Sequence, residues 1–498
     1  MPIPDSLSDP SETTAPPVSA QDQQSQRPGL ILAFLCMAGV MTFLDVTVVN
    51  VSLPSIEKSL NISEASLQYV VTGYGTILGG FLLLAGRLAD TFGRRRMLQA
   101  GLVLFALASL TAGVAQDATM LIVSRCIQGL GAAFIAPSAL SLLTNTFAEG
   151  PARNKALGVW GGMSGMSSVV GVILGGLLTE GPGWRWIFFI NVPIGLAAAF
   201  AAPFVVPESR SEERRKSFDT LGAILLTAAL VLTIYTLGQT IDVGWATARS
   251  IGSLAVAGVL LIAFVLVERR AESPLIPLGI FRRRVLTMAN IVAILLFGTL
   301  VTLFFFASLF MQMVLDYSPI KTGLAYAPLA LVTGVGAGIA SQLVTKVAAK
   351  PVLVAGIAFT IAGMLMLWRL PSDAAYLTEV LPAFLTVGLG LGVSFVPLQV
   401  AAFAGTEKSE AGLAAGLIST SQEAGGSLGV AIAATIAFSE TRRLEKWAHG
   451  DPDLVREART TVFHQAFIVG VWFAVGAVLI ALMLPMLRTS EHDGVPAA

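Results

Sequence analysis

The chain carries very little charge for its length. Only 12% of its 498 residues are Asp, Glu, Lys or Arg, whereas 55% are hydrophobic and the mean hydropathy is +0.77. Soluble domains carry roughly 25% charged residues. So little charge cannot cover a water-exposed surface, which excludes a soluble globular protein and indicates an all-α integral membrane protein. The formal net charge of zero gives no basis for nucleic-acid binding, and we expect no such partner.

Cysteine and histidine are also scarce. Cys36 and Cys126 both lie inside apolar runs, so we expect buried free thiols and no disulfide framework. His449, His464 and His492 are scattered near the C-terminus and form no metal-ligand pattern. No Ser/Lys or His/Asp constellation is arranged for catalysis. The sequence therefore predicts neither an enzyme nor a protein with a metal or organic cofactor.

Long apolar runs follow one another through most of the chain. A helix needs about 20 apolar residues to cross the roughly 30 Å hydrocarbon core of a bilayer. Fourteen runs meet this length, and we predict fourteen transmembrane helices. They cover residues 30–53, 66–86, 97–115, 119–141, 156–178, 185–207, 219–239, 250–268, 285–313, 322–346, 351–370, 376–405, 411–438 and 463–487.

The ends of the chain and the basic residues predict the orientation. Residues 1–28 are polar and have no basic segment beside a short apolar core, so they are expected to form a disordered cytoplasmic tail, as is 489–498. With both termini inside, 20 of the 31 Lys and Arg residues fall on the cytoplasmic side and 10 on the opposite side. This bias favours cytoplasmic termini.

One stretch is repeated. The sequence "GRLADTFGRRRMLQAG" (86–101) aligns without gaps to "SQLVTKVAAKPVLVAG" (341–356), a shift of 255 residues. Both follow the second helix of a predicted six-helix half. We therefore predict halves at 29–208 and 285–488, separated by a linker, 209–284, that contains two extra helices. Related halves around a central site are the architecture of alternating-access transporters, and we expect a monomer.

The first copy of the repeat, residues 86–101, contains glycines and an acid that an orientation signal made of arginines would not need. Gly86 permits close helix approach, Gly93 permits a turn, and Asp90 is placed to cap the third helix and to pair with Arg94. The alternative is that the arginines only hold the turn inside the cell. The stretch resembles the signature loop of the major facilitator superfamily at Gly86, Asp90, Gly93, Arg94 and Arg95. That resemblance implies a charge-based latch on the cytoplasmic side.

Other stretches resemble the fourteen-helix drug:proton antiporters of the EmrB/QacA type, and the resemblance covers the chain after residue 28. It implies a proton-coupled multidrug efflux transporter of the bacterial cell (inner) membrane, which confers antibiotic resistance and exports small lipophilic substrates. The alternatives are an exporter of one metabolite or self-made antibiotic, and a non-transporting membrane sensor. The stretches are "LDVTVVNVSLPSI" (44–56), "RCIQGLGAAFIAPSAL" (125–140), "WRWIFFINVPIG" (184–195), "YSPIKTGLAYAPLAL" (317–331) and "AGLAAGLISTSQEAGGSLGVA" (411–431).

Three ionisable residues lie at bilayer depth, where each is a functional hypothesis. Asp45 lies about 12 Å from the outer end of its helix and Arg125 about 9 Å from the outer end of another. Their matched depth predicts a pair, either coupled to protons or purely structural. Glu423 lies about 18 Å into its helix, and we expect it to be protonated at rest and to give up its proton when a cationic substrate arrives. The alternative is a permanently neutral acid hydrogen-bonded to Gln422, Ser421 or a facing helix.

Two further groups complete the expected site. Glycines at i, i+4 spacing in the fifth helix predict close helix packing. Polar residues in four helices are expected to line the substrate cavity. The packing glycines are Gly161, Gly165, Gly171 and Gly175; the cavity residues are Asn50, Tyr74, Gln128 and Gln422.

Overall fold

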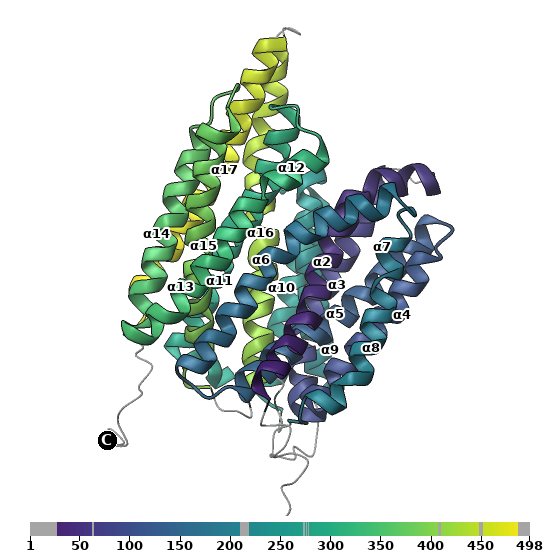
Figure 1. Ribbon diagram of the computed structural model, residues 1–498, viewed down its shortest axis with the longest axis vertical. Helices are drawn as coiled ribbons and strands as arrows, with labels where there is room; N and C mark the ends of the chain where they lie inside the picture. Colours follow the sequence, from purple (N-terminus) through teal and green to yellow (C-terminus); the bar gives the residue numbers. More distant parts are fainter. Residues whose placement is uncertain are drawn as a thin grey trace, which may run out of the picture.

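The computed structural model describes residues 27–61, 64–209, 219–271, 274, 276, 278–406, 410–447 and 452–486; residues 1–26 and 489–498 of the predicted tails lie outside this part. All regular secondary structure in the described part is helical (Figure 1). The helices are α2 (Pro28–Leu60), α3 (Glu64–Phe92), α4 (Arg94–Gly113), α5 (Ala118–Thr146), α6 (Pro151–Glu180), α7 (Trp186–Phe189), α8 (Asn191–Val205), α9 (Thr220–Val243), α10 (Ala248–Glu268), η1 (Leu278–Arg282), α11 (Arg284–Met313), α12 (Pro319–Ala325), α13 (Ala327–Lys346), α14 (Ala349–Trp368), η2 (Tyr376–Val380), α15 (Leu381–Phe403), α16 (Ala411–Trp447) and α17 (Pro452–Leu482).

Short polar residues and proline set several helix boundaries. Asp117 and Asp219 precede α5 and α9, and each carboxylate accepts a hydrogen bond of 2.8 Å from the backbone N–H three residues on. These bonds satisfy N–H groups that have no partner inside the helix. The predicted span 322–346 is divided between α12 and α13, because Pro328 has no N–H to continue the ladder across this point.

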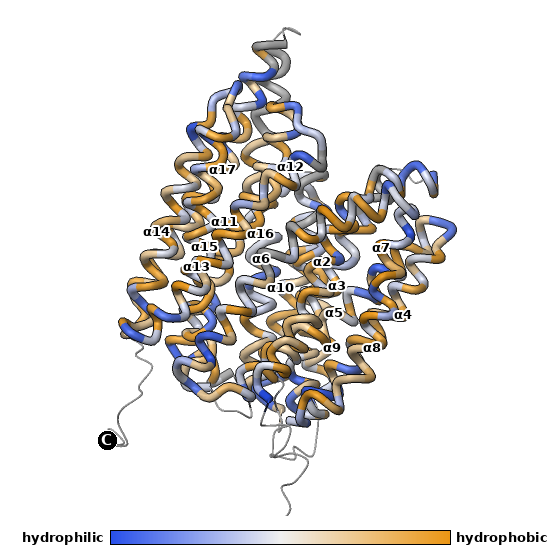
Figure 2. Tube along the Cα trace, viewed as in Figure 1, coloured by the Kyte–Doolittle hydropathy of each residue, from blue (hydrophilic) through white to orange (hydrophobic). Residues whose placement is uncertain are grey.

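Twelve helices of the described residues are long and apolar enough to cross a membrane. Many of their large apolar side chains face outward: Phe200 is 75% exposed, Val259 64% and Ile262 63%. Figure 2 shows hydrophobic residues along the helices and hydrophilic residues toward the two ends of the bundle. Such a surface matches lipid and not water, so the chain is a multi-pass membrane protein. The predicted runs 156–178 and 411–438 lie in α6 and α16, which are not among the twelve.

Helix packing occurs twice in the same pattern. In the first bundle, α2–α8, contacts join α2 to α6, α3 to α5, α4 to α5 and α4 to α8. In the second bundle, α11–α17, the corresponding contacts join α11 to α16, α13 to α15, α14 to α15 and α14 to α17. The bundles meet along two lines of contact, which we call the α3/α16 seam and the α6/α13 seam.

The two helices between the bundles lie on one seam. Helix α9 packs against both α3 and α16, and α10 packs against α9 (Figure 1). A Cβ at Gly80 of α3 would collide with the side chain of Val231, and one at Gly79 would lie 2.6 Å from Ile234 Cδ1. These glycines therefore let α9 approach α3 closely.

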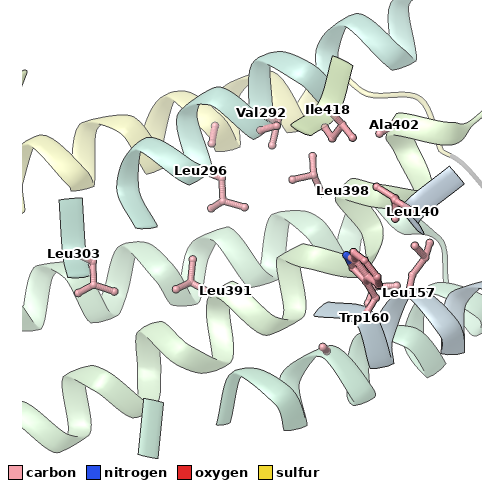
Figure 3. Packing of buried hydrophobic residues seen from close by; sticks show 14 of the residues in the cluster. Leu140, Leu157, Trp160, Val292, Leu296, Leu303, Leu391, Leu398, Ala402 and Ile418 are labelled. Atoms are coloured by element: carbon pink, nitrogen blue, oxygen red, sulfur yellow. The ribbon is translucent and has the colours of Figure 1, made fainter. Parts of the chain in front are cut away.

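The larger of two clusters of buried apolar side chains extends through both bundles, and the smaller lies within the first bundle. Figure 3 shows Leu140, Leu157 and Trp160 of the first bundle beside Leu398 and Ile418 of the second. The bundles are therefore packed tightly against each other at the end where α3 passes to α4. We call this the Asp90 end.

Candidate functional site

The first polar site is the Asp45 cluster, formed by Asp45, Ser109, Arg125, Gln128 and Asn191. All five residues are buried, and they come from α2, α4, α5 and α8. Asp45 and Arg125 form an ion pair, as their matched depth predicts. A buried charge without a partner is very unfavourable, so this pair holds α2 to α5.

Hydrogen bonds complete the Asp45 cluster. Asp45 Oδ1 accepts from Gln128 Nε2 at 2.7 Å and from Asn191 Nδ2 at 3.1 Å. Gln128 also accepts from Arg125 at 2.6 Å and donates to Ser109 Oγ at 2.9 Å. The sequence placed Gln128 in the substrate cavity, but its amide is fully engaged inside this cluster. Asn191 could have been found from its place in the "INVPIG" segment, whereas a single serine such as Ser109 gave no signal.

An aromatic ring separates the Asp45 cluster from a cavity. The Arg125 guanidinium carbon lies 4.4 Å from the centre of the Tyr74 ring, a cation–π contact. Tyr74 also lines the cavity, together with Thr42 and Val46, which flank Asp45 on α2. Tyr74 thus contacts the Asp45 cluster on one side and the cavity on the other.

This central cavity has a volume of about 340 Å³ and lies between the two bundles. Its wall is mainly apolar and aromatic, with a few polar groups, which is the usual make-up of a small-molecule site. The polar residues are Thr42, Tyr74, Thr333, Gln399, Ser419, Gln422 and Glu423; the aromatic ones include Phe43, Trp160, Phe297, Phe304 and Phe395.

Glu423 is the acid of the central cavity. Within the described residues it has no Lys or Arg ion-pair partner and no hydrogen-bond partner. It lies close to α3, since a Cβ at Gly79 would be 3.3 Å from Glu423 Cβ. Buried amide atoms of Gln422 and Gln399 also have no partner among the described residues. Because these polar groups have no hydrogen-bond partner within the described residues, they are available to bind and orient a ligand.

The remaining cavity residue of the sequence analysis is placed elsewhere. Tyr74 and Gln422 line the central cavity, whereas Asn50 is exposed and is not part of its wall. Position 50 lies one turn beyond Asp45 on α2, past the outer limit of the cavity. The geometry thus brings together two of the four expected residues, with Glu423 beside them.

The second polar site joins the two bundles at the Asp90 end. Asp90 pairs with Arg94 at 2.6 Å, and both side chains are 1% exposed. The same carboxylate accepts from the backbone N–H groups of Gly412 and Leu413 at 2.9 Å each. These residues begin α16, where N–H groups lack helical partners and the helix dipole favours an anion.

The sequence prediction that Asp90 caps the third helix is wrong. Helix α4 begins after Gly93, which has φ +108° and provides no side-chain cap. Asp90 instead lies within α3, so its side chain points sideways across the seam to α16. Gly86, one turn earlier, is equally constrained, because a Cβ there would collide with the carbonyl oxygen of Gly412. The glycine permits the close approach that brings Asp90 to the α16 N-terminus.

The arginines after Gly93 are held by the segment that follows α8. Arg94 donates to Ser209 Oγ at 2.8 Å, and the Arg95 backbone N–H donates to Glu208 Oε1 at 3.1 Å. Arg95 and Arg96 each lie 3.6 Å from Glu208. The signature loop is therefore fixed on both sides, by α16 and by the end of the first bundle.

The glycines of α6 have the surroundings expected of packing residues. A Cβ at Gly161 would collide with Phe395 of α15, and one at Gly175 would lie 3.2 Å from Val48 of α2. Gly171 lies against Thr47 in the same way. The packing of Gly165 lies outside the described residues.

Two helical membrane bundles around a cavity, joined at one end where the Asp90 carboxylate binds the first N–H groups of α16, define the class of membrane transport proteins. The chain belongs to the Major Facilitator Superfamily, whose family model matches residues 35–430. It is 37% identical over 478 residues to the puromycin resistance protein pur8 of Streptomyces alboniger, covering 94% of this chain and 93% of that protein.

A second relative and a solved structure agree with this family. The cephamycin export protein CmcT of Amycolatopsis lactamdurans is 36% identical over 467 residues, covering 93% of this chain and 94% of that protein. The proton:xylose symporter XylE, bound to 6-bromo-6-deoxy-D-glucose, has a TM-score of 0.63 at 14% identity, covering 94% of this chain and 98% of that one. This last likeness shows the fold alone.

Proposed function

We propose that this chain is a proton-coupled exporter of small lipophilic molecules, of the fourteen-helix drug:proton antiporter type, working by alternating access. The observation that carries the proposal is Glu423, an acid without a protein partner among the described residues, in an aromatic cavity between the two bundles. A carboxylate there can be neutralised by a proton or by a cationic substrate. The relatives named for puromycin resistance and cephamycin export support the direction, out of the cell.

In this proposal α6 and α16 also cross the membrane and bring the number of spans to fourteen. They have 30 and 37 residues, more than the length a span requires. Gly161 and Gly175 of α6 lie against neighbouring helices, and Gln422 and Glu423 of α16 face the cavity; such small and polar residues lower the apolar content of the two helices. The halves are 29–208 and 285–488, the insert is 209–284, and the Asp90 end faces the cytoplasm of a bacterial cell.

The transport cycle follows from the two acids. In the proposed cycle a proton from outside neutralises Glu423, and a substrate that binds from inside competes with that proton. Arg125 is the fixed cationic partner of Asp45, and its guanidinium group contacts the Tyr74 ring. In the proposed cycle, the charge of Asp45 is coupled to the cavity through these two residues. In this cycle the contact of Asp90, held by Arg94, with the start of α16 forms when the cytoplasmic side closes and breaks when it opens, so it acts as the latch.

Replacing Glu423 by Gln tests the role of its charge. We expect export of a lipophilic cation such as ethidium to fall by at least about tenfold, the effect of about 1.4 kcal/mol, while export of neutral substrates is retained. The measurement is efflux from pump-deleted cells at matched expression. Glu180→Gln, at an exposed acid of α6, is the control. Equal loss, or no loss, for both substrate types would remove Glu423 from substrate recognition.

Replacing Asp45 by Asn tests proton coupling. The amide keeps the shape of the side chain but leaves Arg125 without a counter-charge, so we expect proton-driven efflux to be abolished. The double variant Asp45→Asn, Arg125→Gln removes both charges and guards against a folding defect, which size-exclusion chromatography would reveal. Normal efflux under a pH gradient by either folded variant would show that Asp45 is not an essential carrier.

A narrower candidate is an exporter of one antibiotic. The names of the two relatives described above favour it, since one is named for puromycin and the other for cephamycin. Resistance to a panel of these compounds and of cationic dyes separates the two functions. Protection against one compound only, with no effect on the dyes, would select the specific exporter.

A further inference from the structure

The α6/α13 seam has an open groove at the Asp90 end. Its volume is about 920 Å³, and its walls are formed by Gly158 and Gly162 of α6 and by Gly334 and Gly338 of α13. It opens on the outside of the helical bundle, where Val335 is 59% exposed. A Cβ at Gly338 would meet no other atom within 4 Å. The groove is therefore apolar, wide enough for a hydrocarbon chain and exposed to the membrane.

The same place on the other seam is filled by protein. The shift of 255 residues relates Gly79 and Gly80 of α3 to Gly334 and Val335 of α13. On α3, the side chains of Ile234 and Val231 of the inserted helix α9 pack into this place. Among the described residues, α9 has no counterpart on the α6/α13 seam. A hydrocarbon chain in the groove would supply there the apolar contacts that α9 supplies on the other side.

Two lysines stand at the Asp90 end of the groove. Lys155 and Lys346 belong to its wall and are exposed, and neither has an ion pair or hydrogen bond within the described part of the chain. They directly follow Asn154 and Thr345, whose side chains form the hydrogen bond that joins α6 to α13. The two ammonium groups therefore flank the junction of the two bundles. An anion bound between them would contact both bundles at once.

We propose that this groove binds an anionic phospholipid of the cytoplasmic leaflet, such as phosphatidylglycerol. One acyl chain lies in the groove between α6 and α13, and the phosphate lies between Lys155 and Lys346. The leaflet follows from the orientation in the proposed function, where the Asp90 end is cytoplasmic. Basic pockets between helices on that side attract anionic headgroups. Because the lipid touches both bundles, it favours the arrangement in which the Asp90 end is closed.

Lipid binding to the purified full-length protein tests this proposal. Native mass spectrometry measures retention of phosphatidylglycerol and of phosphatidylcholine with the same acyl chains. At about fivefold per lysine, Lys155→Gln with Lys346→Gln should lower the phosphatidylglycerol affinity roughly 25-fold and leave phosphatidylcholine unchanged. Lys350→Gln, a basic residue outside the groove on the same side, is the matched control. An unchanged preference in the double variant would overturn the headgroup site.

A second pair of variants tests the hydrocarbon part. Gly338→Leu fills the groove without colliding with the protein and should reduce binding of both lipids, whereas Gly258→Leu on the outer helix α10, also in open space, should not. Glycerophosphoglycerol, which has no acyl chains, should fail to compete. If glycerophosphoglycerol competes, the lysines form only an ion site. If the parent protein is a dimer and Gly338→Leu is not, the groove is occupied by a second copy of the chain. Either result overturns the proposal. Transport is not measured, so failure of the exporter function leaves this test intact.

Discussion

The α3/α16 and α6/α13 seams are built from corresponding helices, yet they are joined by different chemistry. On the first, the Asp90 carboxylate binds Arg94 and the N–H groups that begin α16. On the second, position 90 corresponds to Thr345, whose hydroxyl accepts one hydrogen bond of 3.1 Å from Asn154. The first seam is held by buried charge and covered by α9, whereas the second is held by a neutral contact and is open to the membrane.

The difference has a physical cause in where the helices begin. On the α3/α16 seam, Gly412 lies against Gly86. At the corresponding place on the α6/α13 seam, Gly158 lies against Ser341. Helix α16 begins at Ala411, so its free N–H groups are level with Asp90. Helix α6 begins at Pro151, almost two turns before Gly158, so the N–H groups at this level are already bonded within the helix. Only side chains are left to join the second seam. Breaking the first seam therefore has the larger electrostatic cost.

The largest effect is expected from Asp90→Asn. It removes the charge that binds the two N–H groups at the start of α16. Two hydrogen bonds to a charged group are together worth about 3 kcal/mol or more, enough to shift the balance between open and closed states roughly 150-fold. Turnover should fall much more than substrate affinity. Spin-label distances across the Asp90 end and substrate binding in detergent measure the two effects.

Arg96→Ala is the control, since this arginine is 64% exposed on the same loop. It should change neither distances nor turnover, because exposed pairs contribute little. If Asp90→Asn abolishes substrate binding while the distances stay unchanged, the Asp90 contact is part of the binding site and not a latch.

Gly86→Val tests whether the closed seam needs the close approach of α3 and α16. The added Cβ meets the backbone carbonyl of Gly412, which cannot move aside as a side chain can, so we expect a cost of about 1–3 kcal/mol to the closed seam. Cysteines placed near the Asp90 end should become more reactive to a thiol reagent. Gly75→Val, at an open position of the same helix, should leave them protected. Equal protection in both variants would contradict the close packing of α3 and α16.

The smallest effect is expected from Asn154→Ala. It removes one neutral hydrogen bond, worth about 0.5–1.5 kcal/mol, so turnover should stay within about tenfold of the parent protein. Efflux rates measured beside Asp90→Asn give the comparison directly. A loss as large as that of Asp90→Asn would show that the two seams contribute alike, whatever their chemistry.

Parts of the candidate site could be predicted because they depend on depth or on local spacing. Asp45 and Arg125 were paired from their distances to the helix ends, and Asp90 and Arg94 from i, i+4 spacing; both pairs are confirmed as contacts. The assignment of Gln128 to the cavity depended on which way a side chain points. That direction is set by neighbours such as Asp45 and Ser109, which are far away in the sequence.

The sequence by itself determined that this is an all-helical membrane protein with an internal repeat, because hydropathy and the length of a span are properties of consecutive residues. Only the tertiary structure decided that Asp90 binds the start of α16, more than 300 residues away, and that α9 covers one seam and leaves the other open. These contacts depend on helix ends that come level and on the absence of a Cβ where backbones meet. Both are decided by packing in three dimensions.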